Sequence, residues 1–210
     1  MTRKTCIVIS PSQHRLAEGL LDVLDAAGLD VKAWCDPACP DLGDDDIANS
    51  APDILISFLS DRIIRGRALD LPNVNFHPAT PAYPGRGGAS RAIYDGAPSY
   101  GATAHRMAAK VDSGTIYAVG RFAIQPRDTC ATLFYEAENR CLSLARRVLP
   151  DLTVSTIPWS GEAWSRKRLE EWMETDPSAD DFDRKVKALA HPTKPGPFIR
   201  AGGHRFGWVR

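Results

Sequence analysis

The sequence lacks three features that mark common classes of protein. Its 210 residues include 26 Lys and Arg and 26 Asp and Glu, so no net charge draws it to nucleic acid or to an anionic membrane. It has no apolar run long enough to span a bilayer, and no segment is typical of a signal peptide. We therefore expect a cytoplasmic protein with no nucleic-acid partner and no membrane partner.

Cysteine is also scarce. The five cysteines are an odd number at irregular spacing, which indicates reduced thiols rather than a disulfide framework. Cys35 and Cys39 have a spacing that can hold zinc, but no second Cys/His pair with finger-like spacing accompanies them. The sequence therefore predicts no metal site.

Glycine is missing at one informative place. The turn after the first predicted strand, residues 10–14, reads Ser-Pro-Ser-Gln-His. A dinucleotide-binding fingerprint needs glycines there, both for the tight turn and for the close approach of the pyrophosphate. This absence argues against a nicotinamide or flavin dinucleotide cofactor.

The apolar pattern indicates an α/β protein. Short β-branched runs predict strands at 5–10, 29–34, 54–58 and 74–76, and helical spacing between them predicts helices at 13–27 and 62–68. This order is typical of an open, Rossmann-like, mostly parallel sheet with helices on both faces. Further strands are expected at 101–107 and 115–124, with helices from about 89 and over 128–149.

The composition changes after Pro150, because four of the five tryptophans lie beyond it. We expect a main domain at 1–150 and an extension at 151–210, with a helix at 182–189 and a β-hairpin about Gly202 and Gly203. The extension has no Asp or Glu after Asp183. Its basic residues either meet a phosphate or form a solvated surface.

Three polar residues are the candidates for chemistry. Asn75 and His77 alternate along the end of a predicted strand, so their side chains point to the same face. Asp112 begins a predicted turn. An amide can donate to a developing oxyanion, an imidazole can carry a proton, and a carboxylate can tune the imidazole. Each also has a structural interpretation as a turn or loop residue, and His105 is expected to be a hydrogen-bonded structural histidine.

A glycine-rich loop lies close to these residues in the sequence. Residues 83–88 read Tyr-Pro-Gly-Arg-Gly-Gly and precede a predicted helix. Their amides and the Arg86 side chain suit a phosphate or a carboxylate. The alternative is a plain loop whose glycines adopt positive φ angles.

Two stretches resemble motifs of the formyltetrahydrofolate-dependent formyltransferases. The first is residues 74–85, and the second is residues 101–107 followed by the Val-Asp-Ser-Gly of residues 111–114. They occur in the family's order, and the resemblance extends from residue 1 to about 150. Residues 183–206 are similar to the end of sugar N-formyltransferases. The resemblance makes residues 1–150 the formyltransferase catalytic domain. Separately, exposed tryptophans and a hairpin in the extension would suit a homodimer.

The resemblance implies an activity and roles for particular residues. N10-formyltetrahydrofolate would be the formyl donor and a primary amine the acceptor. Asn75 would donate to the formyl oxygen, His77 would stabilise charge or take the amine proton, and Asp112 would pair with His77 and raise its pKa. Folate would contact Ser60, Asp61, Arg62, Ile63, Met107 and Val111. The acceptor would contact Tyr83, Arg86 and Gly87.

The resemblance favours a nucleotide-linked amino sugar as the acceptor. Glycinamide ribonucleotide or another small amine is the alternative, although the glycine-free turn at 10–14 departs from the glycinamide ribonucleotide enzymes. Residues 108–110, Ala-Ala-Lys, replace an acidic stretch common in the family, which alters the expected folate affinity. Two alternative functions stay open. One is a folate-binding or nucleotide-sugar-binding protein without turnover, and the other is hydrolysis of the donor by water.

Overall fold

The computed structural model describes residues 3–37 and 42–207. The elements in chain order are β1 (Lys4–Ile9), α1 (Ala17–Ala26), β2 (Leu29–Cys35), α2 (Asp44–Ser50), β3 (Ile54–Phe58), η1 (Gly66–Asp70), β4 (Asn73–His77), α3 (Gly88–Tyr94), β5 (Ser99–His105), β6 (Ile116–Ala123), α4 (Cys130–Val148), α5 (Arg166–Met173), α6 (Phe182–Leu189), β7 (Phe198–Ala201) and β8 (His204–Gly207).

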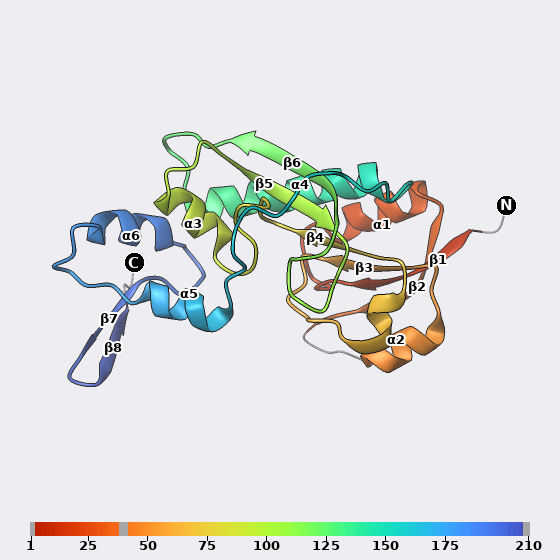
Figure 1. Cartoon of the computed structure of the whole chain (residues 1–210), viewed down its shortest axis with the longest axis horizontal. Helices are drawn as coiled ribbons and strands as arrows, with labels where there is room; N and C mark the ends of the chain where they lie inside the picture. Colours follow the sequence, from red (N-terminus) through yellow and green to blue (C-terminus); the bar gives the residue numbers. More distant parts are fainter. Residues whose placement is uncertain (1–2, 38–41, 208–210) are drawn as a thin grey trace.

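The centre of the molecule is a six-stranded sheet in the order β2-β1-β3-β4-β5-β6. The four strands β2, β1, β3 and β4 are parallel, whereas β5 and β6 are antiparallel to their neighbours. Helices lie on both faces of this sheet (Figure 1). The predicted fold class, a mostly parallel open sheet with a C-terminal helix and β-hairpin, is confirmed.

Alternation along the strands divides the core between the two faces. Cys6 and Val8 of β1 belong to one cluster with residues of α1 and α4, and Ile7 and Ile9 belong to another with residues of α2 and η1. All four side chains are fully buried. Because β1 is covered on both faces, it reads as a continuous apolar run rather than an alternating one.

Several predicted boundaries differ from the structure, each for a local reason. The helix expected from residue 13 begins at Ala17, because residues 11–16 form successive turns. The helix expected at 62–68 is wrong: the segment has a short 3₁₀ helix from Gly66, whose φ of +63° interrupts any longer helix. The strand expected to reach Met107 ends at His105, since the Met107 N–H donates to the side chain of Asn73 at 2.6 Å.

The C-terminal extension folds as two helices and a hairpin. Helix α6 has the predicted bounds, and the hairpin turns at Gly202 and Gly203, whose φ angles are +56° and +79°. Helix α5 was not predicted, although Ser165 caps it by accepting from the Arg168 N–H at 3.1 Å. The last predicted hairpin residue, Trp208, lies outside the described residues.

Nothing in the structure tests the predicted division at residue 150, so it stays a prediction. The hairpin leaves Phe206 53% exposed, and the homodimer likewise stays a prediction. Within residues 3–37 and 42–207, no helix is long and apolar enough to cross a membrane.

Candidate active site

Strand pairing assembles the first part of the site. In the antiparallel pair β4·β5, Asn75 lies opposite His105 and His77 lies opposite Thr103. The Nδ2 atom of Asn75 is 3.0 Å from the Nε2 atom of His105. Since Asn75 and His77 are two residues apart on β4, both project from the same face of the strand end.

Asp112 reaches these residues from the loop between β5 and β6. Its Oδ2 atom is 3.4 Å from His77 Nε2, and its Oδ1 atom is 3.3 Å from His105 Nε2. The Gly85 N–H donates to Oδ2 at 2.7 Å. The structure therefore brings together the amide, imidazole and carboxylate that the sequence predicted, and adds His105 as a fourth member.

The Asp112 backbone adopts an uncommon conformation. Its φ is +45°, in the left-handed region that few residues other than glycine occupy. Two residues on, a Cβ atom at Gly114 would lie 1.9 Å from the carbonyl oxygen of Arg106. The turn can close only with glycine there, and this closure aims the Asp112 carboxylate at the two histidines. Backbone strain of this kind clusters at functional sites.

The Asp112 carboxyl group is ionised at neutral pH. Burial alone would raise its pKa, but the charge of His77, the hydrogen bond and charge of His105, and the Gly85 N–H together hold its pKa well below the ordinary value. The two side chains of the pair are largely withdrawn from water, at 14% exposure for His77 and 6% for Asp112.

Burial sets the net pKa of His77. Desolvation lowers its pKa below the ordinary value, and the charge of Asp112 offsets only part of that effect. Asp112 raises the pKa of His77, as expected, but the larger effect of burial makes the net shift downward. A neutral imidazole weakens the pull of His77 on Asp112, but the Gly85 N–H still favours the carboxylate.

The protonation of the His77 ring follows from its partners. Its buried Nε2 atom makes no hydrogen bond among the described residues, because the 3.4 Å approach to Asp112 lacks hydrogen-bond geometry. A backbone hydrogen bond with Tyr83 favours the charged ring. A neutral ring with its proton on Nδ1 leaves the Nε2 lone pair free to accept a proton.

His105 is both the hydrogen-bonded histidine that the sequence predicted and a member of the site. It is 2% exposed, and its Nδ1 atom lies 2.8 Å from the carbonyl oxygen of Arg106, to which it donates. In the neutral ring Nε2 then accepts from Asn75. A protonated ring would instead donate from Nε2 to Asp112. The pairing of β4 with β5 was the signal that could have placed it in the site.

The residues predicted to contact folate occupy two loops. Ser60, Asp61, Arg62 and Ile63 follow β3, and Met107 and Val111 lie in the loop that carries Asp112. The Arg62 guanidinium points to α2, where it donates to Asp44 at 2.7 Å. Ile63 and Val111 present apolar side chains at 46% and 43% exposure. Their contact with folate stays a prediction.

The glycine-rich loop uses its amides inside the protein. The Gly85 N–H is committed to Asp112, and the Arg86 N–H donates to the carbonyl of Trp164 at 2.8 Å. Gly85 and Gly87 both have positive φ angles, as the plain-loop alternative expected. For Gly85 and Arg86, the expected amide cradle for a phosphate is therefore not what the structure shows.

The side chains predicted to contact the acceptor lie in unlike surroundings. The Tyr83 ring is buried beside Tyr100, and desolvation raises the pKa of Tyr83 to about 12. The Arg86 guanidinium is half-exposed, 3.4 Å from Asp61 Oδ2, and Arg166 approaches the same oxygen at 3.4 Å. Arg86 and Arg166 thus present two positive charges beside the proposed folate loop. The roles of Tyr83, Arg86 and Gly87 stay predictions.

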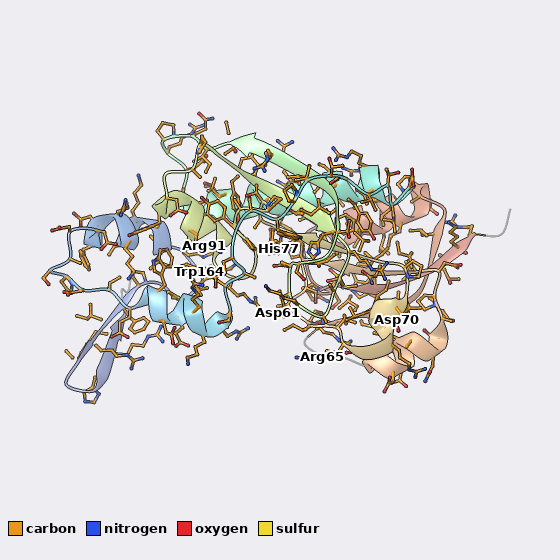
Figure 2. The ribbon with its side chains drawn as sticks, viewed as in Figure 1. Asp61, Arg65, Asp70, His77, Arg91 and Trp164 are labelled. Atoms are coloured by element: carbon orange, nitrogen blue, oxygen red, sulfur yellow. The ribbon has the colours of Figure 1, made fainter. Side chains whose placement is uncertain are left out.

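The C-terminal extension packs directly against the site loops. Arg91 of α3 lies 4.3 Å from the ring centre of Trp164, and the two are adjacent in Figure 2. Arg91 also donates to the carbonyl of Pro84 at 3.0 Å. Trp164 and Trp172 stack edge to face, and Arg168 lies 4.7 Å from the Trp164 ring. These tail aromatics therefore pack within the protein.

Two features lie apart from the polar group, the name we give to the side chains of Asn75, His77, His105 and Asp112. In the described part of the chain, no three His, Cys, Asp or Glu side chains form a group suited to a metal ion, and Cys39 lies outside that part. A hollow of about 550 Å³ opens between β6 and α4, lined by residues such as Phe122, Leu133 and Tyr135. It includes none of the four site residues, so we do not assign the chemistry to it.

Solved structures define the class of fold. The whole chain superposes on 98% of a 4-N formyltransferase from Francisella tularensis, with a TM-score of 0.82 and 16% identity. For a sugar N-formyltransferase from a Shewanella species the TM-score is 0.79 and the identity 15%, over 98% of this chain and 96% of that one. HypX from Aquifex aeolicus, in complex with tetrahydrofolic acid, matches 98% of this chain with 37% of its own, at a TM-score of 0.65 and 19% identity.

These likenesses show a formyltransferase fold. A model of the formyl transferase family matches residues 40–153, more than half of the sequence and the whole region that carries Asn75, His77, His105 and Asp112. The protein belongs to the formyl transferase family, which confirms the predicted resemblance.

Proposed function

We propose that the protein transfers a formyl group from N10-formyltetrahydrofolate to the amino group of a nucleotide-linked amino sugar. The convergence of Asn75, His77 and Asp112 carries this proposal. The amide and the neutral imidazole share one face of β4, and the carboxylate lies within 3.4 Å of the imidazole. Membership of the formyl transferase family supports formyl transfer as the reaction.

Each side chain has one task in the transfer. The Asn75 amide has two N–H groups, one of which points to His105. The other has no partner within residues 3–37 and 42–207, so it can donate to the formyl oxygen as that oxygen gains negative charge. His77 Nε2 accepts a proton from the amine as its nitrogen bonds to the formyl carbon. Asp112 stabilises the imidazolium that results, and His77 then returns the proton to the departing nitrogen.

The residues around the site fit a folate donor. Bound folate supplies an activated formyl carbon. The exposed apolar side chains of Ile63 and Val111 suit the flat faces of a pterin, and they belong to loops that adjoin the polar group. Tetrahydrofolic acid bound to HypX, which shares the fold, supports the same choice of donor.

The acceptor is proposed from charge and from the named relatives. The guanidinium groups of Arg86 and Arg166 both lie 3.4 Å from Asp61 Oδ2. We propose that they bind the phosphates of the nucleotide when the acceptor is present. Two of the similar structures are a 4-N formyltransferase and a sugar N-formyltransferase.

The test is an assay of tetrahydrofolate release with a panel of acceptors. The panel contains nucleotide-linked amino sugars, glycinamide ribonucleotide and simple amines. We expect release together with the mass gain of one formyl group on an amino sugar. Formylation of glycinamide ribonucleotide alone would replace the acceptor, formate production would indicate hydrolysis, and tight folate binding without turnover would remove the proposal.

A further inference from the structure

The segment between α4 and α5, residues 149–165, contacts the backbone on both sides of the polar group. It is pinned at two places: the Ser155 N–H donates to the carbonyl of Ile116 at 2.9 Å, and the Ser160 and Gly161 N–H groups both donate to the carbonyl of Pro81 at 3.1 Å. Trp159 lies between these anchors. The anchors are the first residue of β6, just after the Asp112 turn, and the loop after His77, so the segment joins two backbone stretches that adjoin the site.

The second anchor allows little movement. A Cβ atom at Gly161 would lie 1.9 Å from the carbonyl oxygen of Ala82, so the two backbones are in close contact. The loop that begins after His77 also supplies the Gly85 N–H that binds Asp112. A shift of this segment is therefore transmitted to the Asp112 carboxylate through that loop.

Trp159 makes two contacts with the polar group itself. Its indole Nε1 donates to the carbonyl of Gly114 at 2.7 Å, at the end of the turn that carries Asp112. Its ring meets the His105 ring edge to face, with 5.0 Å between the ring centres. His105 in turn contacts both Asn75 and Asp112, so one side chain supports the amide and the carboxylate at once.

We propose that Trp159 is a positioning residue for formyl transfer, which fixes the Asp112 turn through Gly114 and the Asn75 amide through His105. This inference rests on the proposed function. Misplacement of reacting groups by about 1 Å can cost about 100-fold in rate. Because Trp159 acts on the site through Gly114 and His105, its loss should lower kcat while KM for the folate donor changes little.

The experiment compares Trp159→Phe with Trp34→Phe. Both indoles are half-buried, and Trp34 Nε1 donates to the carbonyl of Ser10 at 2.9 Å, so each variant loses one hydrogen bond of the same kind. We expect similar thermal stability in the two proteins. Only Trp159→Phe should lose kcat, by about 10- to 100-fold, with KM for N10-formyltetrahydrofolate within about twofold of the unaltered protein.

Nitrogen NMR of the histidine rings provides a readout that does not need activity. The His105 signals, assigned with His105→Gln, should move in Trp159→Phe and stay in place in Trp34→Phe. An unchanged His105 signal in Trp159→Phe, or an unchanged kcat, would overturn the inference. If the unaltered protein transfers no formyl group to any acceptor, the proposed function fails, and the NMR comparison alone decides whether Trp159 positions the polar group.

Discussion

His77 and Asp112 lie 3.4 Å apart although 35 positions separate them in the sequence, one at the end of β4 and the other in a left-handed turn after β5. Desolvation lowers the pKa of the imidazole, while its surroundings hold the carboxyl group ionised. A neutral base thus sits beside a fixed negative charge. This pairing suits proton abstraction from an amine, because the charge stabilises the imidazolium only once it forms.

Asn75→Ala tests the oxyanion role. Removal of one preorganised donor typically lowers kcat by about 10²–10³-fold, and we expect a loss in that range with little change in KM for the donor. Steady-state kinetics measure it. Asn49→Ala, on the exposed face of α2, is the control and should keep the kcat of the unaltered protein. A kcat for Asn75→Ala within about threefold of that value would contradict the role.

The pH profile tests the state of His77. Because burial lowers its pKa below 6.5, the base form persists into mildly acidic solution, and the acid limb of kcat/KM should fall below pH 6.5. The Asp112 charge raises the pKa of His77, so Asp112→Asn should move the limb to still lower pH and reduce the rate by about 10²–10⁴-fold. A limb above pH 6.5 in the unaltered protein would refute the neutral-base assignment.

Stability should depend on pH through the same imidazole. Its folded-state pKa is lower than its unfolded-state value, so the unfolded chain binds more protons as the pH falls past that value. The free energy of unfolding should therefore decrease from pH 7.5 to pH 5.5 more steeply in the unaltered protein than in His77→Gln. Urea titrations at the two pH values measure both slopes. Equal slopes would show that His77 titrates alike in the two states.

Gly114→Ala tests the closure of the Asp112 turn. A Cβ atom there would meet the Arg106 carbonyl oxygen at 1.9 Å, so the turn must open. We expect a loss of about 1–3 kcal/mol in unfolding free energy together with a fall in kcat. Gly120→Ala on β6 is the matched control, because its Cβ would have an ordinary contact of 3.6 Å with Leu144. Equal stability of the two variants would be evidence against the required closure.

Much of the fold could be predicted because local pattern and tertiary structure agree. The strands β1 and β3 are short apolar runs buried on both faces, and α6 has the bounds that its amphipathic spacing predicted. The prediction from local pattern failed where a side chain distant in the sequence accepts a hydrogen bond from a backbone N–H group. The Met107 N–H leaves the β5 ladder for Asn73, and the Arg65 N–H goes to Asp44, just before the positive φ of Gly66.

The site could be predicted only in part. Asn75 and His77 stand out because strand alternation places them together, and Asp112 stands out through its motif. The cross-strand partner His105, the donating Gly85 N–H and the supporting Trp159 depend on register and on the return of the C-terminal segment. Neither the register of β4 against β5 nor the return of the C-terminal segment has a short-range signal in the sequence. The net pKa of His77 also needed the burial that only the assembled structure defines.

Transfer of an isotopically labelled formyl group, followed by NMR, tests the central claim most directly. The label starts on N10-formyltetrahydrofolate in the presence of a nucleotide-linked amino sugar and the unaltered protein, with Asn75→Ala in parallel. We expect the label to move to a formamide on the sugar nitrogen, about 10²–10³-fold more slowly in the variant than in the unaltered protein. Label that stays on the folate with the unaltered protein, or appears as free formate, would contradict that claim.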